Sequence, residues 1–367
     1  MPLDESRLEE LLRFLVERRG SDLHVKVGSP PRIRVDGNLQ PAPFDAPSAA
    51  DVERLAYAVL PPVRADEFER SHEADFALDL TGIGRFRVNV YRQRGTCALV
   101  FRSVAPGIPS IEALGLPPVV ERLADERRGL VLVTGPTGSG KTTTIASVID
   151  HINATRAVNI VTIEDPIEVL HTDRRAIVSQ REIGADTEGF AQAMRRVLRQ
   201  DPDVIFVGEM RDPETVWAAL AAAETGHLVL STLHTTDAPE TVNRIIDFFP
   251  PHQHHQIRLS LAGSLRGIVS QRLLARADQL GRVPAVEVLV NTGRVYERIV
   301  DPDAPGESIP ELIQGGEYYG MQTFDQSIVG LYRDGHVGLR EAMATATNPS
   351  DLRIMLQQAG LPLTASV

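Results

Sequence analysis

Residues 129–142 read GLVLVTGPTGSGKT, an apolar run that leads into a glycine-rich turn. The run predicts a buried strand, the turn has the full GxxxxGKT spacing, and the residues that follow predict a helix. Glycines let backbone amides approach a phosphate, and the start of the helix adds a favourable dipole. We therefore predict a nucleotide-binding loop formed by Gly135, Pro136, Thr137, Gly138, Ser139, Gly140, Lys141, Thr142 and Thr143.

Two side chains of this loop have distinct expected roles. The Lys141 ammonium would neutralise the β and γ phosphates of ATP, and the Thr142 hydroxyl would hold the accompanying Mg²⁺. A glycine-rich turn without a ligand is the alternative, but the complete spacing between a strand and a helix favours the nucleotide site. ATP and Mg²⁺ are therefore the expected ligands.

Further short apolar runs follow the loop, at residues 159–163, 204–207 and 227–232. Because they are apolar along their length, they predict parallel strands buried on both faces of a sheet, with helices between them. This pattern indicates an α/β ATPase core over residues 118–270. The chain beyond it, residues 271–367, is expected to be mainly helical.

The chain before the core has a different pattern. Apolar residues at helical spacing in 8–17 and alternating residues in strands such as 84–91 indicate a mixed α+β domain over residues 1–104. Asp36-Gly37 predicts a turn between strands. Two prolines and a glycine then predict an extended linker over residues 105–117.

The composition is that of a globular protein, with 367 residues, 43% hydrophobic and 24% charged. The net charge of −11 disfavours nucleic acid as a partner, because phosphate backbones repel an acidic chain. A single cysteine, Cys97, excludes an intrachain disulfide and a cysteine-based zinc site, and its place in a strand pattern predicts a small core or interface residue. The acidic start lacks a signal-peptide pattern, and no apolar run reaches the roughly 18 residues of a membrane helix, so we expect a cytoplasmic protein.

Acidic residues follow two of the apolar runs. Glu209 comes after the run 204–207 and, with the phosphate loop upstream, is expected to polarise the attacking water. Residues 162–168, TIEDPIE, place three carboxylates at the end of another run. They could form a metal- or water-organising cluster, or the solvated start of a helix, where acids are favourable in any case.

Four motifs in order resemble those of the secretion-type ATPases, and in particular the PilT and PilU branch that drives bacterial type IV pili. They are the phosphate loop, an Asp box at 162–168, an extended Walker B at 201–212 (DPDVIFVGEMRD) and a His box at 226–238 (GHLVLSTLHTTDA). The likeness continues in SDLH at 21–24, PPRIRVDG at 30–37, RFRVN at 85–89, QRLL at 271–274 and YGMQT at 319–323. It covers residues 5–356, nearly the whole chain.

The resemblance implies a PAS-like N-terminal α+β domain, a RecA-like P-loop domain and a helical C-terminal extension. It implies a homohexamer in which each N-terminal domain packs against the ATPase domain of a neighbour. The implied activity is ATP hydrolysis that drives pilus retraction and twitching motility. The implied partners are an inner-membrane platform protein, which would hold the motor at the cytoplasmic face of that membrane, and a second pilus motor ATPase.

The resemblance also implies roles for five side chains. Glu164 would be the Asp-box acid, His234 a γ-phosphate sensor and His227 the other functional histidine of its box. Arg85 and Arg87 would bring positive charge to the nucleotide. The residues alone leave open a core role for both histidines, and a solvated strand face for the arginines, which also include Arg92 and Arg94.

Assembly motors usually carry a tetracysteine zinc module and an additional N-terminal domain. A single cysteine cannot build that module, and because the chain is short we expect it to lack the additional domain. Both features favour the retraction branch. One departure weakens the match: the AIRNLIRE-like helix of retraction motors is replaced by GRVYERIV at 293–300, followed by an insert-like DPDAPGE at 301–307. This departure leaves pilus or pseudopilus assembly as an alternative. A non-hydrolysing accessory subunit is a separate alternative, against which Lys141 and Glu209 argue. The HQHH sequence at 252–255 favours a polar helix start over a metal site, because no acid or cysteine lies near it.

Overall fold

The structure is a computed structural model that describes residues 5–35, 37–104 and 107–363. Asp36 of the predicted turn and residues 105 and 106 of the predicted linker lie outside the described residues. Contacts divide the chain into two compact units. The first unit is Met1–Gly107 with the short segments Asp165–Leu170 and Glu182–Asp186, and the second is the remainder of the chain.

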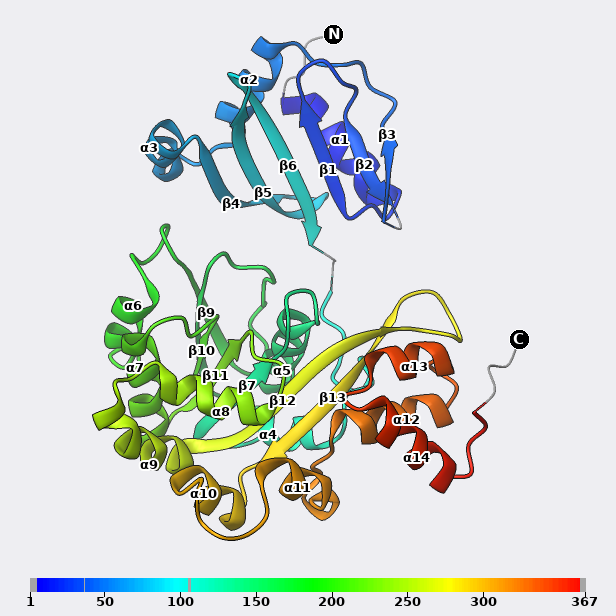
Figure 1. The fold of residues 1–367 in the computed structure, drawn as a ribbon. Coiled ribbons are helices and arrows are strands. Elements are labelled where there is room, and N and C mark those ends of the chain that lie inside the picture. Colours follow the sequence, from blue (N-terminus) through cyan, green and yellow to red (C-terminus); the bar gives the residue numbers. More distant parts are fainter. Residues whose placement is uncertain (1–4, 36, 105–106, 364–367) are drawn as a thin grey trace. The chain divides into compact units, whose positions relative to one another are not determined.

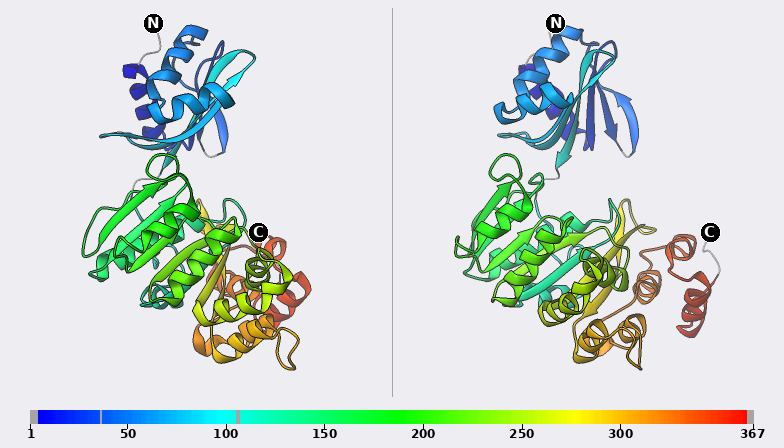
Figure 2. Two further views of the ribbon diagram at one scale, coloured as in Figure 1. Left: turned by 90° about the vertical axis from the view of Figure 1, so that its left-hand side faces the viewer. Right: turned by 60° about the vertical axis from the view of Figure 1, so that its left-hand side comes forward.

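The first unit is an antiparallel sheet in the order β3-β2-β1-β6-β5-β4, with its helices on one face (Figure 2). Its strands are β1 (Asp22–Lys26), β2 (Arg32–Val35), β3 (Asn38–Pro41), β4 (Glu73–Leu80), β5 (Gly84–Gln93) and β6 (Thr96–Val104). Its helices are α1 (Glu5–Glu17), α2 (Ala49–Val59) and α3 (Pro62–Ser71). The predicted mixed α+β character is confirmed.

Alternation along the strands decides which face each side chain occupies. Phe86, Val88 and Val90 of β5 are buried in the core that includes the apolar residues of α1 and α2. Since successive residues of a strand point to opposite faces, Arg85 and Arg87 project from the other face of the sheet. Cys97 on β6 is buried in the same core, as its strand pattern predicts.

The second unit is built on a sheet in the order β13-β12-β7-β11-β10-β8-β9 (Figure 1). Strands β7, β8, β10, β11 and β12 run parallel, and β13 pairs antiparallel with β12. The strands are β7 (Gly129–Thr134), β8 (Asn159–Glu164), β9 (Ile177–Glu182), β10 (Val204–Val207), β11 (Leu228–Leu233), β12 (Leu265–Ala275) and β13 (Arg282–Val290). All residues of β7, β10 and β11 are buried, which confirms the predicted sheet with two covered faces.

Helices connect and cover these strands. They are α4 (Val119–Ala124), α5 (Lys141–Thr155), α6 (Phe190–Val197), α7 (Pro213–Glu224), α8 (Ala238–Asp247), η1 (Pro251–Gln253) and α9 (His254–Ser264). The HQHH sequence includes the start of α9 at His254, in agreement with the predicted helix start. The sheet continues to Val290, beyond the core boundary at residue 270 that the sequence suggests, because β12 and β13 form a buried hairpin.

The chain after the hairpin is helical, and part of it packs on β12 and β13 (Figure 1). Its elements are α10 (Gly293–Val300), α11 (Ile309–Gln314), η2 (Glu317–Tyr319), α12 (Phe324–Arg333), α13 (Leu339–Thr345) and α14 (Pro349–Gln358). Phe324 and Ile328 of α12 share a core with Val283 and Ala285 of β13. This packing places the C-terminal helices against the edge of the ATPase sheet.

The segment that departs from the family pattern forms α10. The Thr292 hydroxyl caps the helix by accepting a hydrogen bond from the Val295 amide, and Val295 and Ile299 are buried. Arg298 donates to the carbonyls of Pro302 and Ala304, at 3.0 and 2.7 Å, and so fastens the turn-rich segment 301–307 to the helix. The apolar spacing that the sequence preserves therefore serves helix packing.

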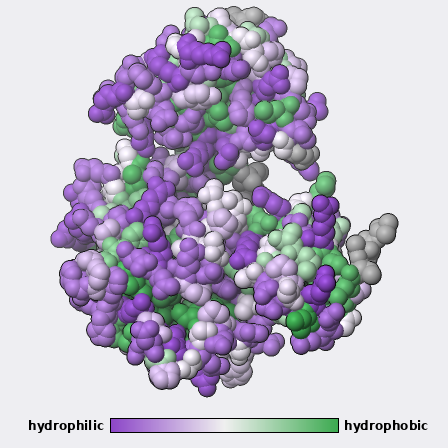
Figure 3. All heavy atoms as spheres, in the orientation of Figure 1, coloured by the Kyte–Doolittle hydropathy of each residue, from purple (hydrophilic) through white to green (hydrophobic). Residues whose placement is uncertain are grey.

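Most residues on the face drawn in Figure 3 are hydrophilic. Within residues 5–35, 37–104 and 107–363, no helix is long and apolar enough to span a lipid bilayer.

Candidate active site

The predicted site residues follow the carboxyl ends of neighbouring parallel strands of the second unit. The phosphate loop follows β7, Glu164 ends β8, Glu209 comes after β10, and His234 comes directly after β11. Because parallel strands end at one edge of a sheet, these groups are brought to the same edge. That edge is where α/β proteins of this topology bind ligands.

The backbone of the phosphate loop needs glycine at both ends. Gly135 has a φ of +140°, and a Cβ added there would lie 2.5 Å from the Gln271 carbonyl oxygen. Gly140 has a φ of +92° and precedes Lys141, the first residue of α5. Side chains are strained at such angles, so the sequence forms this tight strand-to-helix turn only because glycine stands at both positions.

The polar groups inside the loop fit a phosphate. Lys141 is only 9% exposed, and its Nζ donates to the carbonyl oxygens of Gly135 and Pro136 at 2.7 and 3.0 Å. The Ser139 hydroxyl is buried and has no hydrogen-bond partner within the part of the chain that the structure describes. Thr142, in the first turn of α5, is exposed and can present its hydroxyl to a ligand. These groups form a site that an anionic oxygen would complete.

A line of polar contacts joins the loop to the end of β10. His234 Nδ1 lies 3.4 Å from Lys141 Nζ, and His234 Nε2 lies 3.2 Å from Glu209 Oε1. The other carboxylate oxygen, Glu209 Oε2, accepts a hydrogen bond of 2.8 Å from Arg211 Nε. Since an ammonium only donates and a carboxylate only accepts, these contacts select the histidine tautomer with the proton on Nε2. The structure thus brings Lys141, His234 and Glu209 together, and their roles in hydrolysis stay predictions.

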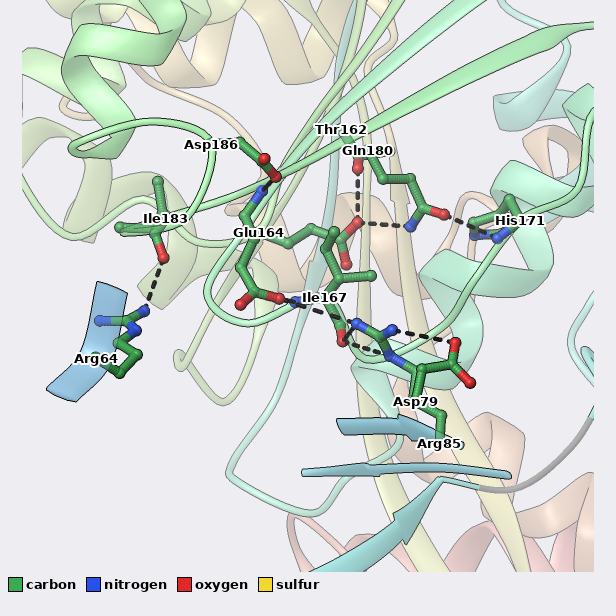
Figure 4. Close-up of polar contacts among 11 residues, drawn as sticks. Arg64, Asp79, Arg85, Thr162, Glu164, Ile167, His171, Gln180, Ile183 and Asp186 are labelled. Atoms are coloured by element: carbon green, nitrogen blue, oxygen red, sulfur yellow. Dashed lines mark hydrogen bonds and ion pairs between the residues drawn. The ribbon is translucent and has the colours of Figure 1, made fainter. Parts of the chain in front are cut away.

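Glu164 occupies the same edge at the end of β8 (Figure 4). Its Oε1 accepts hydrogen bonds from the Thr162 hydroxyl at 2.6 Å and from Gln180 Nε2 at 3.1 Å. Gln180 Oε1 in turn accepts from the His171 amide at 2.8 Å. The bonds from Thr162 and Gln180 therefore fix the orientation of the Glu164 carboxylate.

Arg85 and Arg87 contact acidic and carbonyl groups of the first unit. Arg85 donates to the Ile167 carbonyl oxygen from Nη2 at 2.9 Å and from Nε at 3.2 Å (Figure 4). Glu182 Oε2 lies 3.9 Å from Arg85 and accepts from the Ile167 amide at 3.0 Å, while Arg87 lies 3.7 Å from Glu168. The arginines thus bind the segment that follows the Asp-box strand, and their expected contact with nucleotide stays a prediction.

His227 does not join the other predicted residues. It precedes β11, and its Nδ1 donates to the Ala222 carbonyl oxygen at 2.9 Å. His234 follows β11, so the two histidines are separated by the full strand of six residues, which at about 3.3 Å per residue is roughly 20 Å. His227 and His234 therefore lie at opposite ends of β11, and the functional role expected for His227 stays a prediction.

Thr162, Gln180 and Arg211 support the candidate site, and no role was predicted for them. Thr162 lies two residues before Glu164 on the same strand, so the period of a strand could have identified it. Gln180 comes from β9, and no local pattern in the sequence relates it to Glu164. Among the described residues, no cluster of three or more His, Cys, Asp or Glu side chains is arranged to hold a metal ion.

Comparison with known proteins gives a consistent result. The sequence profile of the family described as "Type II/IV secretion system protein" matches residues 8–307. The chain is 41% identical over 344 residues to the type IV pilus retraction ATPase PilT of Pseudomonas aeruginosa, covering 94% of this chain and 99% of that protein. It is 40% identical over 349 residues to the type IV pilus ATPase PilU of the same organism, covering 95% and 91%.

A solved structure is also similar. The crystal structure of the pilus retraction motor PilT with bound ADP matches with a TM-score of 0.86 and 44% sequence identity. The match covers 95% of this chain and 99% of that one.

Proposed function

We propose that this chain, which belongs to the type II/IV secretion system protein family and to the PilT/PilU-type ATPases within it, uses ATP hydrolysis to retract type IV pili. The contact line Lys141–His234–Glu209 at the carboxyl edge of the sheet carries the hydrolysis part of this proposal. The similarity to a retraction ATPase over nearly the whole of both chains supports retraction of the pilus and not its assembly.

Each side chain of the site has a role that follows from its position. Lys141 would exchange the loop carbonyls for β- and γ-phosphate oxygens of ATP, and the Thr142 hydroxyl would hold Mg²⁺, which offsets the phosphate charge when bound. Glu209 would orient the attacking water and accept its proton. His234, which contacts the Glu209 carboxylate, would sense the γ phosphate. Glu164, fixed by Thr162 and Gln180, would add a second carboxylate near the reacting centre.

The proposal also covers the oligomeric state of the chain and its location in the cell. As a motor of this family, the chain would act as a homohexamer bound to a platform protein at the cytoplasmic face of the inner membrane. A second pilus motor ATPase is the further partner in this proposal, because one organism, Pseudomonas aeruginosa, has two pilus ATPases, PilT and PilU, that match this chain almost equally well. A non-hydrolysing accessory role is less compatible with the complete set of Lys141, Glu209 and His234.

Deletion of the gene tests whether the chain retracts pili or assembles them. If the chain retracts pili, cells that lack it keep surface pili that no longer shorten, and twitching stops. If it assembles pili, the same cells lose their pili. Complementation with the parent gene and with the Glu209→Gln variant separates loss of hydrolysis from loss of the protein, since only the parent should restore pilus shortening.

The two histidines of the His box should differ in their effects. We expect His234→Ala to lower ATP turnover by about 10- to 100-fold, because it removes the group between Lys141 and Glu209. His227→Ala should leave the affinity for ATP within about twofold of the parent, since His227 bonds to Ala222 at the other end of β11. Steady-state hydrolysis and titration with a fluorescent ATP analogue measure both effects. Parental turnover in His234→Ala, or a large affinity loss in His227→Ala, would contradict this assignment.

A further inference from the structure

Glu287 is an acidic residue that the sequence does not mark as functional, yet it is only 9% exposed. It lies on β13 directly opposite Ser270 of β12, and Ser270 Oγ accepts a hydrogen bond of 2.9 Å from Thr134 Oγ1. Thr134 is the last residue of β7, immediately before the phosphate loop. Glu287 therefore belongs to the part of the sheet that supports the loop.

The Glu287 carboxylate reaches from this sheet to helix α8. Its Oε1 accepts a hydrogen bond of 2.8 Å from the backbone amide of Ala238. Ala238 is the first residue of α8, where helix amides lack partners within the helix and attract negative charge. The contact thus ties the start of α8 to β13.

The start of α8 is joined in turn to the loop that carries His234. The hydroxyls of Thr235 and Thr241 lie 2.6 Å apart, and the Thr236 amide donates to Glu240 at 2.7 Å. These bonds hold residues 234–237 and the first turn of α8 together as one piece. A side chain that fixes this turn therefore fixes the position of His234 as well.

We propose that Glu287 is a positioning residue for ATP hydrolysis, whose carboxylate holds the start of α8 and thereby keeps His234 between Lys141 and Glu209. The inference rests on the proposed function, since it requires that His234 contributes to turnover. Glu287 acts through its hydrogen bond to the Ala238 amide.

Charges from three elements face Glu287, namely Asp237 of the loop before α8, Arg272 of β12 and Asp325 of α12. Burial, the largest cause, raises the pKa of the Glu287 carboxyl to about 7, and Asp237 and Asp325 act in the same direction. The Ala238 hydrogen bond and Arg272 oppose this shift. Glu287 should therefore change its charge near neutral pH.

The sign of the effect on positioning follows from the hydrogen bond. A charged carboxylate accepts a hydrogen bond from the Ala238 amide more strongly than a neutral one, so this bond to the start of α8 strengthens as the pH rises through about 7.

The contribution of Glu287 to the free energy of unfolding changes in the opposite direction. Because the folded pKa lies above the ordinary value of 4.5, the stability contribution of the neutral carboxyl is present below about 4.5 and is lost as the pH rises to about 7.

The pH profile of Glu287→Gln tests the proposal. The glutamine carbonyl resembles the protonated carboxyl, so at pH 6 the variant should turn over ATP at the parental rate. At pH 8 the parent should be about fivefold faster in kcat, with KM for ATP within about twofold, because only the parent then has a charged acceptor. Glu287→Leu, which offers Ala238 no acceptor, should be slower at both pH values. A parent-to-variant ratio that is the same at every pH would overturn the proposal.

Two further variants make the outcome specific. Glu341 is the matched control, because it also accepts a backbone amide, that of Ala275 at 3.0 Å, and Ala275 is five residues beyond Ser270 on β12 and does not belong to α8. Glu341→Gln should keep the parental pH profile. His234→Ala separates the two proposals: parental turnover in that variant refutes the role of His234, whereas slow turnover there with a parental Glu287→Gln at pH 8 refutes the role of Glu287 alone. Binding of a fluorescent ATP analogue confirms that each variant is folded.

Discussion

Lys141→Ala should weaken ATP binding by about 100-fold, since a charged hydrogen-bond donor to two phosphate groups is lost. The Lys141 ammonium is buried in the phosphate loop and bonds to two loop carbonyls, at 2.7 and 3.0 Å. In the variant these carbonyls would lie near the phosphates without a cation to offset the negative charge. Titration with a fluorescent ATP analogue measures the loss directly.

The chain offers a matched control for this experiment. Its sequence contains only two lysines, Lys26 and Lys141. Lys26 lies on β1 and is exposed, so Lys26→Ala removes the same side chain and the same charge away from the loop. It should bind ATP like the parent. If Lys141→Ala also binds with parental affinity, the ammonium does not hold the phosphates and the site is assigned incorrectly.

Glu209→Gln should retain ATP binding and lose turnover by about 100- to 1,000-fold. The substitution keeps the size of the side chain and an oxygen that can accept from Arg211 or His234. It removes the negative charge that orients water and accepts its proton, so the chemical step is affected and the binding step is not. Single-turnover hydrolysis, together with the same binding titration, separates the two steps.

Glu224→Gln serves as the control for Glu209→Gln. Glu224 is exposed at the end of α7, and its neutralisation changes the net charge equally without touching the phosphate edge. It should hydrolyse ATP at the parental rate. Undiminished hydrolysis by Glu209→Gln would mean that another carboxylate activates the water, and Glu164 would be the first to examine.

The sequence predicts most of the second unit because its signals are local. A run of apolar residues before GxxxxGKT defines both β7 and the phosphate loop, and the carboxyl ends of parallel strands must meet at one edge. The convergence of Glu164, Glu209 and His234 follows from that rule. The hairpin of β12 and β13 is less evident, since its apolar residues suit a helix as well as a strand.

Contacts between residues far apart in sequence were not predictable in the same way. Gln180 reaches Glu164 from β9, and Glu287 reaches Ala238 from β13, and neither pair is related by helical or strand spacing. The place of His227 could have been inferred, because a residue before a buried strand must lie at the opposite edge from one after it. Family resemblance grouped the two histidines, whereas the length of β11 separates them.

Mg²⁺-dependent ATP turnover across a range of protein concentrations tests the central claim most directly, with Glu209→Gln measured beside the parent. A hexameric motor should show turnover per subunit that rises steeply as subunits assemble, requires Mg²⁺ and is abolished in the variant. Tight ATP binding by the parent without turnover at any concentration, with or without Mg²⁺, would contradict the account of this chain as a hydrolysing motor.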